Sequence, residues 1–243
     1  MFKSIYIHPL TYLLIIIAMI TANFKKIIIY MSLIFVHELG HFLTAKYYRW
    51  NTDKIYIYPL GGITRFNDLI NKSLKEELII ILMGPLFQII FFLILVCFKV
   101  ENIAFFNWTL LLFNLLPIYP LDGGKILNIL LACLLPYKTS YIITIHIAFI
   151  SYFLLFIFII INYKSLFLFI ILISLVFKIM DEYSKRNYYF NKFLLERYLN
   201  NYRYKKIKYI TTINSMSREK THFILSDNRV YTEKEILKKY FKL

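Results

Sequence analysis

The sequence has little charge and almost no cysteine, and both shortages limit what the chain can be. Only 18% of its 243 residues are charged, while 59% are hydrophobic and the mean hydropathy is +0.60. That balance excludes a soluble globular domain and predicts a multi-spanning membrane protein with polar loops and one small aqueous extension. Both cysteines, Cys97 and Cys133, lie in apolar segments, which excludes a disulfide framework and a C-x-x-C site.

Acidic residues are also scarce: 14 Asp and Glu stand against 29 Lys and Arg, giving a net charge of +15. In a soluble protein this excess would suggest nucleic acid, but no nucleic-acid-binding motif accompanies it. We therefore assign the basic residues to the cytoplasmic side of a membrane and predict the lipid bilayer, and no nucleic acid, as a partner. The N-terminal apolar block has no small-residue cleavage signature, so we expect it to be a retained span.

The apolar segments predict an all-α polytopic membrane protein with six transmembrane helices, each near the length that crosses ~30 Å of hydrocarbon. We expect them at approximately 9–23, 27–47, 78–98, 103–118, 141–162 and 165–180, with a tight turn at 24–26. After a break at two prolines, the fourth continues into a second apolar piece, 125–135. Basic residues are concentrated in the 48–77 loop and the 181–243 tail, which places both termini, that loop and the tail in the cytoplasm. Residues 1–180 would then form the membrane core, and residues 181–243 a basic cytoplasmic extension.

Within the 48–77 loop, β-branched and aromatic residues flank Gly61-Gly62, which predicts a short β-hairpin. Its apolar composition favours a hairpin that dips into the membrane boundary beside the second span. A hairpin on the aqueous surface fits the pattern equally well.

The sequence His37-Glu38-Leu39-Gly40-His41 lies inside the second span. On a helix, residues four apart point to one side, so both imidazoles can bind one metal ion, and Glu38 can serve as general base. Because such groups are costly in hydrocarbon, their presence there indicates function. The alternatives are a chance match or two core histidines.

A catalytic zinc needs three protein ligands, and the other histidines are poor candidates. His8 lies at the edge of the first span, His146 is alone in the fifth, and His222 is in the tail. Asp122 follows a helix broken by two prolines, and such backbone at membrane depth is tolerated only in protein or beside a wet cavity. The alternative for Asp122 is a helix-capping role in an Asp-Gly turn. Topology brings Asp122 and His41 to a similar depth near the cytoplasmic leaflet, which favours a shared site.

These two motifs together, His37-Glu-Leu-Gly-His41 and Asn114-x-x-Pro117-x-x-Pro120-Leu-Asp122-Gly-Gly124, resemble the site-2 protease family (M50) of intramembrane zinc metalloproteases. The resemblance implies one Zn²⁺ held by His37, His41 and Asp122, with Glu38 activating the hydrolytic water. It also implies that Asn114, Pro117 and Pro120 shape the substrate path. The Gly61-Gly62 hairpin would correspond to a membrane re-entrant β-loop beside which substrate adds as a strand.

Within the family, the order of elements is similar to the branch that cleaves a sporulation sigma-factor precursor. This implies a membrane-associated precursor as substrate, membrane regulatory or inhibitory proteins as partners, and a bacterial membrane such as that around the forespore. Relatives in that branch carry a cytoplasmic CBS-type domain, and the 63-residue tail has room for one short repeat at most. The alternatives are a catalytically silent scaffold of the same fold and a transporter. The intact motif residues argue against the scaffold, and the single broken span argues against the transporter.

Overall fold

The computed structural model describes residues 5–7, 11–12, 16, 24–58, 61–66, 70–100, 103–162, 166–200, 202, 204–226 and 229–241. The chain divides into two compact units, the first formed by residues 1–68 and 76–115 and the second by residues 69–75 and 116–243. Each unit is described by itself below.

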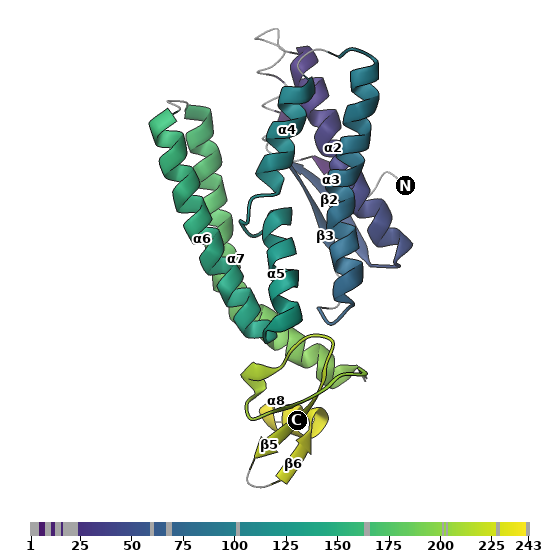
Figure 1. The fold of residues 1–243 in the computed structure, drawn as a ribbon, viewed down its shortest axis with the longest axis vertical. Helices are drawn as coiled ribbons and strands as arrows, with labels where there is room; N and C mark the ends of the chain where they lie inside the picture. Colours follow the sequence, from purple (N-terminus) through teal and green to yellow (C-terminus); the bar gives the residue numbers. More distant parts are fainter. Residues whose placement is uncertain are drawn as a thin grey trace. The chain divides into compact units, whose positions relative to one another are not determined.

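The first unit combines helices with a small sheet (Figure 1). From residue 24 onward, its described helices are α2 (Phe24–Tyr47), all but the first two residues of α3 (Leu74–Cys97), and α4 (Ile103–Asn114). Strands β1 (Ile5–Ile7), β2 (Thr52–Tyr58) and β3 (Gly61–Phe66) form a sheet in that order, with β1 parallel to β2 and β2 antiparallel to β3. Helix α2 packs against both β2 and β3, so the predicted hairpin lies beside the helix that carries the two histidines.

The second unit begins with α5 (Asp122–Leu134), followed by the paired helices α6 (Tyr137–Asn162) and α7 (Leu166–Leu199). Beyond α7, strands β4 (Ile207–Ile210), β5 (Thr221–Ser226) and β6 (Arg229–Thr232) form a second sheet, with a 3₁₀ turn (Ile213–Ser215) after β4. Helix α8 (Glu233–Phe241) follows and buries Leu237 completely in a cluster with Phe193, Leu194 and Met216. Residues 204–241, called the C-terminal module below, are thus built around a core of their own that includes the end of α7.

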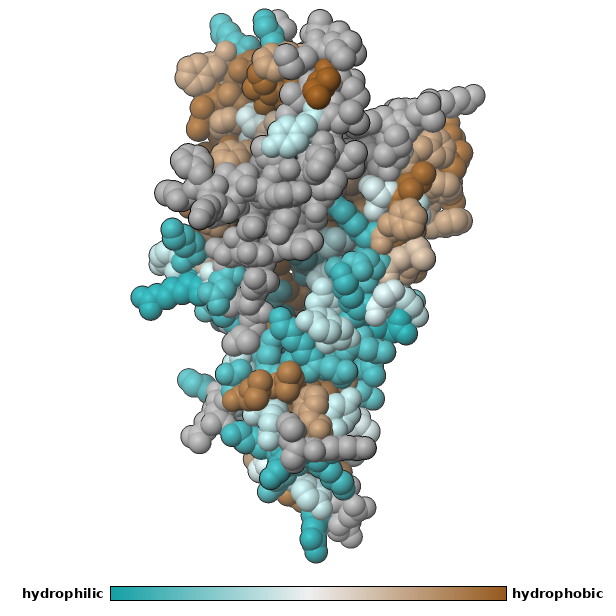
Figure 2. Space-filling model, turned by 180° about the vertical axis from the view of Figure 1, so that it is seen from behind, coloured by the Kyte–Doolittle hydropathy of each residue, from teal (hydrophilic) through white to brown (hydrophobic). Residues whose placement is uncertain are grey.

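The prediction of a multi-pass membrane protein with several apolar helices is confirmed. Among the described residues, α2, α3 and α6 are long and apolar enough to cross a membrane, and α4 is a shorter apolar helix. The exposed side of α3 carries an apolar stripe at helical spacing, formed by Leu82, Leu86, Ile90 and Leu93. Such a stripe suits contact with lipid chains. In Figure 2, apolar side chains are exposed over the helices, and the C-terminal module presents a mixture of hydrophilic and apolar side chains.

Three details of the prediction change. Residues 24–26 are the first turn of α2 and not a separate turn, because nothing in Phe-Lys-Lys stops a helix. The fold is mostly helical but not all-α, since β4, β5 and β6 form a sheet in the tail that the sequence pattern did not predict. The expected first span, 9–23, lies largely outside the described residues, and the sixth is the first part of α7, which runs on to Leu199.

The hairpin is confirmed, but its glycines do not form the turn. Gly61 pairs with Tyr58 and Gly62 with Ile57, so both glycines belong to β3. Pro59 and Leu60, which connect the strands, lie outside the described residues. A Gly-Gly pair is a strong turn signal, so the sequence pattern favours a turn at Gly61-Gly62. In the structure, both glycines are instead paired with residues of β2.

Candidate metal centre

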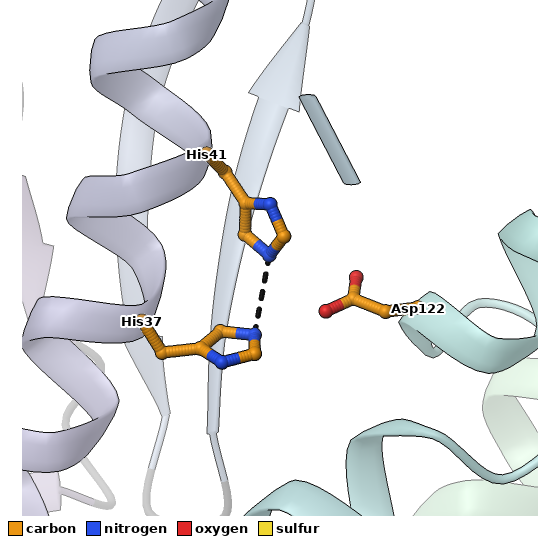
Figure 3. A group of neighbouring side chains, drawn as sticks. All are labelled: His37, His41 and Asp122. Atoms are coloured by element: carbon orange, nitrogen blue, oxygen red, sulfur yellow. Dashed lines mark hydrogen bonds between the residues drawn. The ribbon is translucent and has the colours of Figure 1, made fainter. Parts of the chain in front are cut away.

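His37 and His41 lie on one face of α2, one turn apart, and both are almost fully buried (Figure 3). Their Nε2 atoms are 3.2 Å apart, and the two rings meet nearly edge to face. The spacing predicted from the sequence therefore brings both imidazoles to one point.

The proton position on His41 follows from its neighbour on α3. Its Nδ1 lies 2.9 Å from the backbone oxygen of Ile80, and a carbonyl oxygen can only accept a hydrogen bond. Nδ1 must therefore carry the proton, so Nε2 is the nitrogen with the lone pair.

The proton position on His37 follows from a longer chain of contacts. The Nε2 of Gln88 lies 3.0 Å from the backbone oxygen of Asn107, so this end of the amide must be the NH₂ donor. The other end, Oε1, therefore accepts from His37 Nδ1 at 2.9 Å, so the lone pair of His37 is on Nε2, the nitrogen that faces His41.

The two Nε2 atoms lie 3.2 Å apart, and both can face one cation. They cannot bond to each other without an added proton, whereas a metal ion satisfies both at once. Two nitrogens on a tetrahedral zinc, at ~2.0–2.1 Å each, are about 3.3–3.4 Å apart. The histidine pair fits that ion.

Two glycines allow the close approach of α2 and α3 around the pair. A Cβ on Gly84 would overlap the ring of His41, and a Cβ on Gly40 would overlap the backbone of Met83. Side chains at these positions would displace the ring or separate the helices. Sequence reasoning missed both Gly84 and Gln88, although Gln88 is the only glutamine in the chain and lies in an apolar helix.

Glu38 follows His37 on α2 and is also buried, with 4% of its surface exposed. Asn114, at the end of α4, has its Nδ2 3.5 Å from His37 Nε2. Glu38 and Asn114 both belong to the first unit, and the Asn114 amide is near the proposed metal ligand His37.

Asp122 is the first residue of α5 in the second unit; its side chain is drawn with the two histidines in Figure 3. It is 5% exposed, and its Oδ1 lies 3.2 Å from Lys125 Nζ. Leu121 occupies the N-cap position, without a side-chain cap, so Asp122 is not the capping residue that the alternative interpretation required.

The segment before Asp122 is not helical, as the two prolines predicted. Pro117 and Pro120 are half-buried and lie in the segment of chain that connects α4 to α5. Backbone hydrogen bonds from Ile118 N to Leu116 O and from Leu121 N to Ile118 O form tight turns in this segment. A Cβ on Gly124 would lie 2.7 Å from the Cα of Tyr119, so only glycine lets α5 lie against this turn.

The remaining histidines do not join the pair in the described part of the chain. His146 is exposed on α6, and its Nδ1 bonds to the Ile142 oxygen of the same helix. His222 is buried in the C-terminal module, and His8 lies outside the described residues.

Comparison with known proteins gives consistent results. The sequence matches peptidase family M50 over residues 25–102 and 98–158. It is 26% identical over 234 residues to stage IV sporulation protein FB of Bacillus subtilis (strain 168), covering 92% of this chain and 81% of that one. It is 33% identical over 119 residues to a zinc metalloprotease of Methanocaldococcus jannaschii, covering 44% of this chain and 34% of that one.

A solved structure, the site-2 protease from Methanocaldococcus jannaschii, has a similar fold. The TM-score is 0.58 at 24% sequence identity, and the match covers 73% of this chain and 89% of that one.

Proposed function

Because the chain belongs to peptidase family M50 and is a zinc metalloprotease, we propose that it hydrolyses peptide bonds of membrane-associated proteins within or at the edge of the bilayer. The observation that carries this proposal is the buried histidine pair, whose Nε2 lone pairs face each other at 3.2 Å on an apolar helix. A shared metal ion would accept both of these lone pairs at once.

We assign one Zn²⁺ to His37, His41 and Asp122. Each of the three is buried and offers one ligand atom, and two imidazoles with one carboxylate are an established zinc donor set. When bound, the metal supplies Lewis acidity that polarises the scissile carbonyl and makes water a better nucleophile at neutral pH.

Glu38 is assigned as general base. It takes a proton from the attacking water and passes it to the leaving amine, and its burial keeps bulk water from competing for that proton. Asn114 directs an amide donor toward the region beside His37 Nε2, where it can hydrogen-bond a substrate carbonyl.

The substrate path is assigned to Pro117, Pro120 and the Gly61-Gly62 start of β3. A transmembrane helix must unwind before cleavage, and its freed backbone groups need new partners. Because the described sheet order is β1-β2-β3, one side of β3 has no partner strand within it, and an extended segment can add there.

For the membrane arrangement, we propose six spans with both termini and the tail in the cytoplasm of a bacterial cell. The substrate we propose is a sporulation sigma-factor precursor, processed at the membrane around the forespore under the control of membrane regulatory or inhibitory proteins. The similarity to a stage IV sporulation protein over 92% of the chain supports this assignment.

The tail, 181–243, is proposed to be a short CBS-like regulatory region. Its support is a dense contact with the segment before α3, centred on Asn71. The Asn71 side chain donates to Glu196 and Phe193 O and accepts from Arg197, and its backbone oxygen accepts from Tyr204. The tail thereby holds the start of the helix that carries Ile80 and Gln88.

The proposed function is tested by co-expression with candidate precursors, using Glu38→Gln as control. This variant keeps the size of the side chain and loses its basicity, so it should bind one zinc and cleave nothing. Continued cleavage would remove Glu38 from the reaction, and absence of zinc from the wild-type protein would refute the metalloprotease assignment at this site.

Two further variants separate the remaining possibilities. Asp122→Ala should reduce zinc retention and abolish cleavage, and unchanged zinc stoichiometry and activity would exclude Asp122 as a ligand. A catalytically silent scaffold, the alternative function, would bind precursors without cleaving them in the wild-type protein as well as in Glu38→Gln.

A further inference from the structure

Gln88 is a buried polar side chain in the middle of an apolar helix, and the proposed chemistry does not use it. It lies on α3, is fully buried, and is the only glutamine in the sequence. Burying an amide in such surroundings costs several kcal/mol unless its hydrogen bonds are made. Here both ends of the amide are bonded.

The contacts of Gln88 form a directed chain from α4 to α2. Its Nε2 donates to the backbone oxygen and to the Oδ1 of Asn107, both at 3.0 Å. Its Oε1 accepts from His37 Nδ1 at 2.9 Å. Because the backbone carbonyl at one end can only accept, the direction of every hydrogen bond in the chain is fixed.

That direction has a consequence for His37. An imidazole that swings about its Cβ or exchanges its proton between nitrogens would present its Nε2 lone pair only part of the time. The Gln88 oxygen holds the proton on Nδ1 and holds the ring in one plane, so the Nε2 lone pair keeps one direction. His41 obtains the same constraint from the backbone oxygen of Ile80.

We propose that Gln88 is a positioning residue for the metal site, which fixes the tautomer and orientation of His37, and that Asn107 in turn orients Gln88. The proposal rests on the proposed function, because it concerns the same metal site. It adds two residues, on two further helices, that neither the H-E-x-x-H motif nor the Asp122 motif contains.

Asn107 has the features expected of the supporting residue. It is fully buried, and its Nδ2 has no hydrogen-bond partner among the described residues. Its contribution to the chain is thus through its oxygens. Since its backbone oxygen would still accept from Gln88 after a side-chain substitution, the Asn107 side chain should matter less than Gln88 itself.

The experiment compares zinc affinity in three variants of the full-length protein, measured by competition with a chelator, with Co²⁺ absorption as a second readout. Gln88→Met keeps the length of the side chain and removes all three of its hydrogen bonds. It should weaken zinc binding about 10–100-fold, the range found for groups that orient metal ligands. Gln88→Glu keeps an acceptor for His37 Nδ1, and the unpartnered Asn107 Nδ2 can turn to donate to it. This variant should stay within about threefold of wild type, and its Co²⁺ spectrum should match.

A third variant, Asn107→Leu, tests the order of the chain and does not alter Gln88. It should weaken zinc binding by less than Gln88→Met does, because one acceptor for Gln88 remains. The proposal is overturned if Gln88→Met binds zinc as tightly as wild type, or if Met and Glu weaken binding equally. It is also overturned if Asn107→Leu has the larger effect.

The two proposals fail in different ways. If the wild-type protein binds no zinc, or Glu38→Gln still cleaves substrate, the proposed function fails. If the wild type binds zinc and Glu38→Gln is inactive, but Gln88→Met retains full zinc affinity, only the role of Gln88 is refuted.

Discussion

Replacement of Gly84 by alanine adds one methyl group and should weaken zinc binding at the metal site. The three atoms nearest to the new Cβ all belong to the His41 ring: Cε1, Nε2 and Cδ2. Even the farthest of them, Cδ2, would lie 2.9 Å away, whereas ordinary contact begins at 3.4 Å. The ring must therefore move by at least half an ångström, or α3 must move away from α2.

The magnitude follows from what the movement breaks. Ligands must be held within about 0.5 Å of their productive positions, so the required shift alone reaches the tolerance. If the ring turns, the buried bond from His41 Nδ1 to Ile80 O is lost as well, at a cost of about 1–3 kcal/mol. At 1.4 kcal/mol per factor of ten, this corresponds to roughly 5–150-fold in zinc affinity.

The assay is chelator competition on the purified protein in detergent, with circular dichroism to confirm that the helices are intact. Leu82→Ala is the matched control, because Leu82 lies two residues away on the same helix and is 46% exposed. It should bind zinc as the wild type does. If Gly84→Ala is folded and its zinc affinity is within about twofold of wild type, the inferred contact between α3 and His41 is wrong.

Two predictions concern the C-terminal module. Burial lowers the pKa of His222 below 6.5, although Glu233 opposes the shift. Protonation of His222 would break the hydrogen bond from Ser217 N to its Nε2. The module should therefore be most stable above pH 6.5 and lose stability progressively below it. Hydrogen exchange of β5, corrected for intrinsic rates, should be faster at pH 5.5 than at pH 7.5; equal protection, or an unchanged pH response in His222→Gln, would contradict this. Glu219 accepts from the Leu74 N–H at the start of α3 at 2.8 Å, so Glu219→Ala should cost about 1 kcal/mol and reduce cleavage of the natural substrate. The matched Glu235→Ala, which removes a similar bond at the start of α8, should leave cleavage unchanged, and equal effects of the two would show that Glu219 does not act through α3.

The shifted pKa values of His222 and Glu233 both make the C-terminal module more stable at high pH than at low pH. Burial alone would raise the pKa of Glu233, but the hydrogen bond from His222 and the charge of Arg197 outweigh it, and the net pKa is lowered. A carboxylate with a depressed pKa stabilises the fold at pH values above its unfolded-state pKa. It loses that contribution only as the pH falls through its folded-state pKa. The loss between pH 6.5 and 5.5 is therefore assigned to His222.

The sequence was sufficient for the features that depend on short spacings. The spacing of four positions from His37 to His41 fixes a common face on any helix, and long apolar runs predict α2, α3 and α6. Pro117 and Pro120 predict a break, and helix α4 indeed ends at Asn114, before them. In each case one local rule decides the outcome.

The features that the sequence did not reveal depend on residues far apart in the chain. The sheet of β4, β5 and β6 is made of strands four to six residues long, which alternate too briefly to be told from loops. Gly84 acts through a ring 43 positions away, and Asn71 through residues of α7 more than 120 positions away. Only packing brings such partners together.

Gln88 lies between these two cases, and it shows which signal remains in an apolar sequence. Its partners, His37 and Asn107, cannot be identified from spacing, but its cost can. An amide in hydrocarbon is retained only where its bonds are made, and the bonds of Gln88 reach α2 and α4. Two other amides near the site, the buried one of Asn107 and the half-buried one of Asn114 at the end of α4, follow the same logic, since one supports Gln88 and the other contacts His37. Not every polar side chain within an apolar helix does this, since His146 bonds to its own helix, but the buried amide of Gln88 marks contacts of α3 with α2 and α4 that lead to His37.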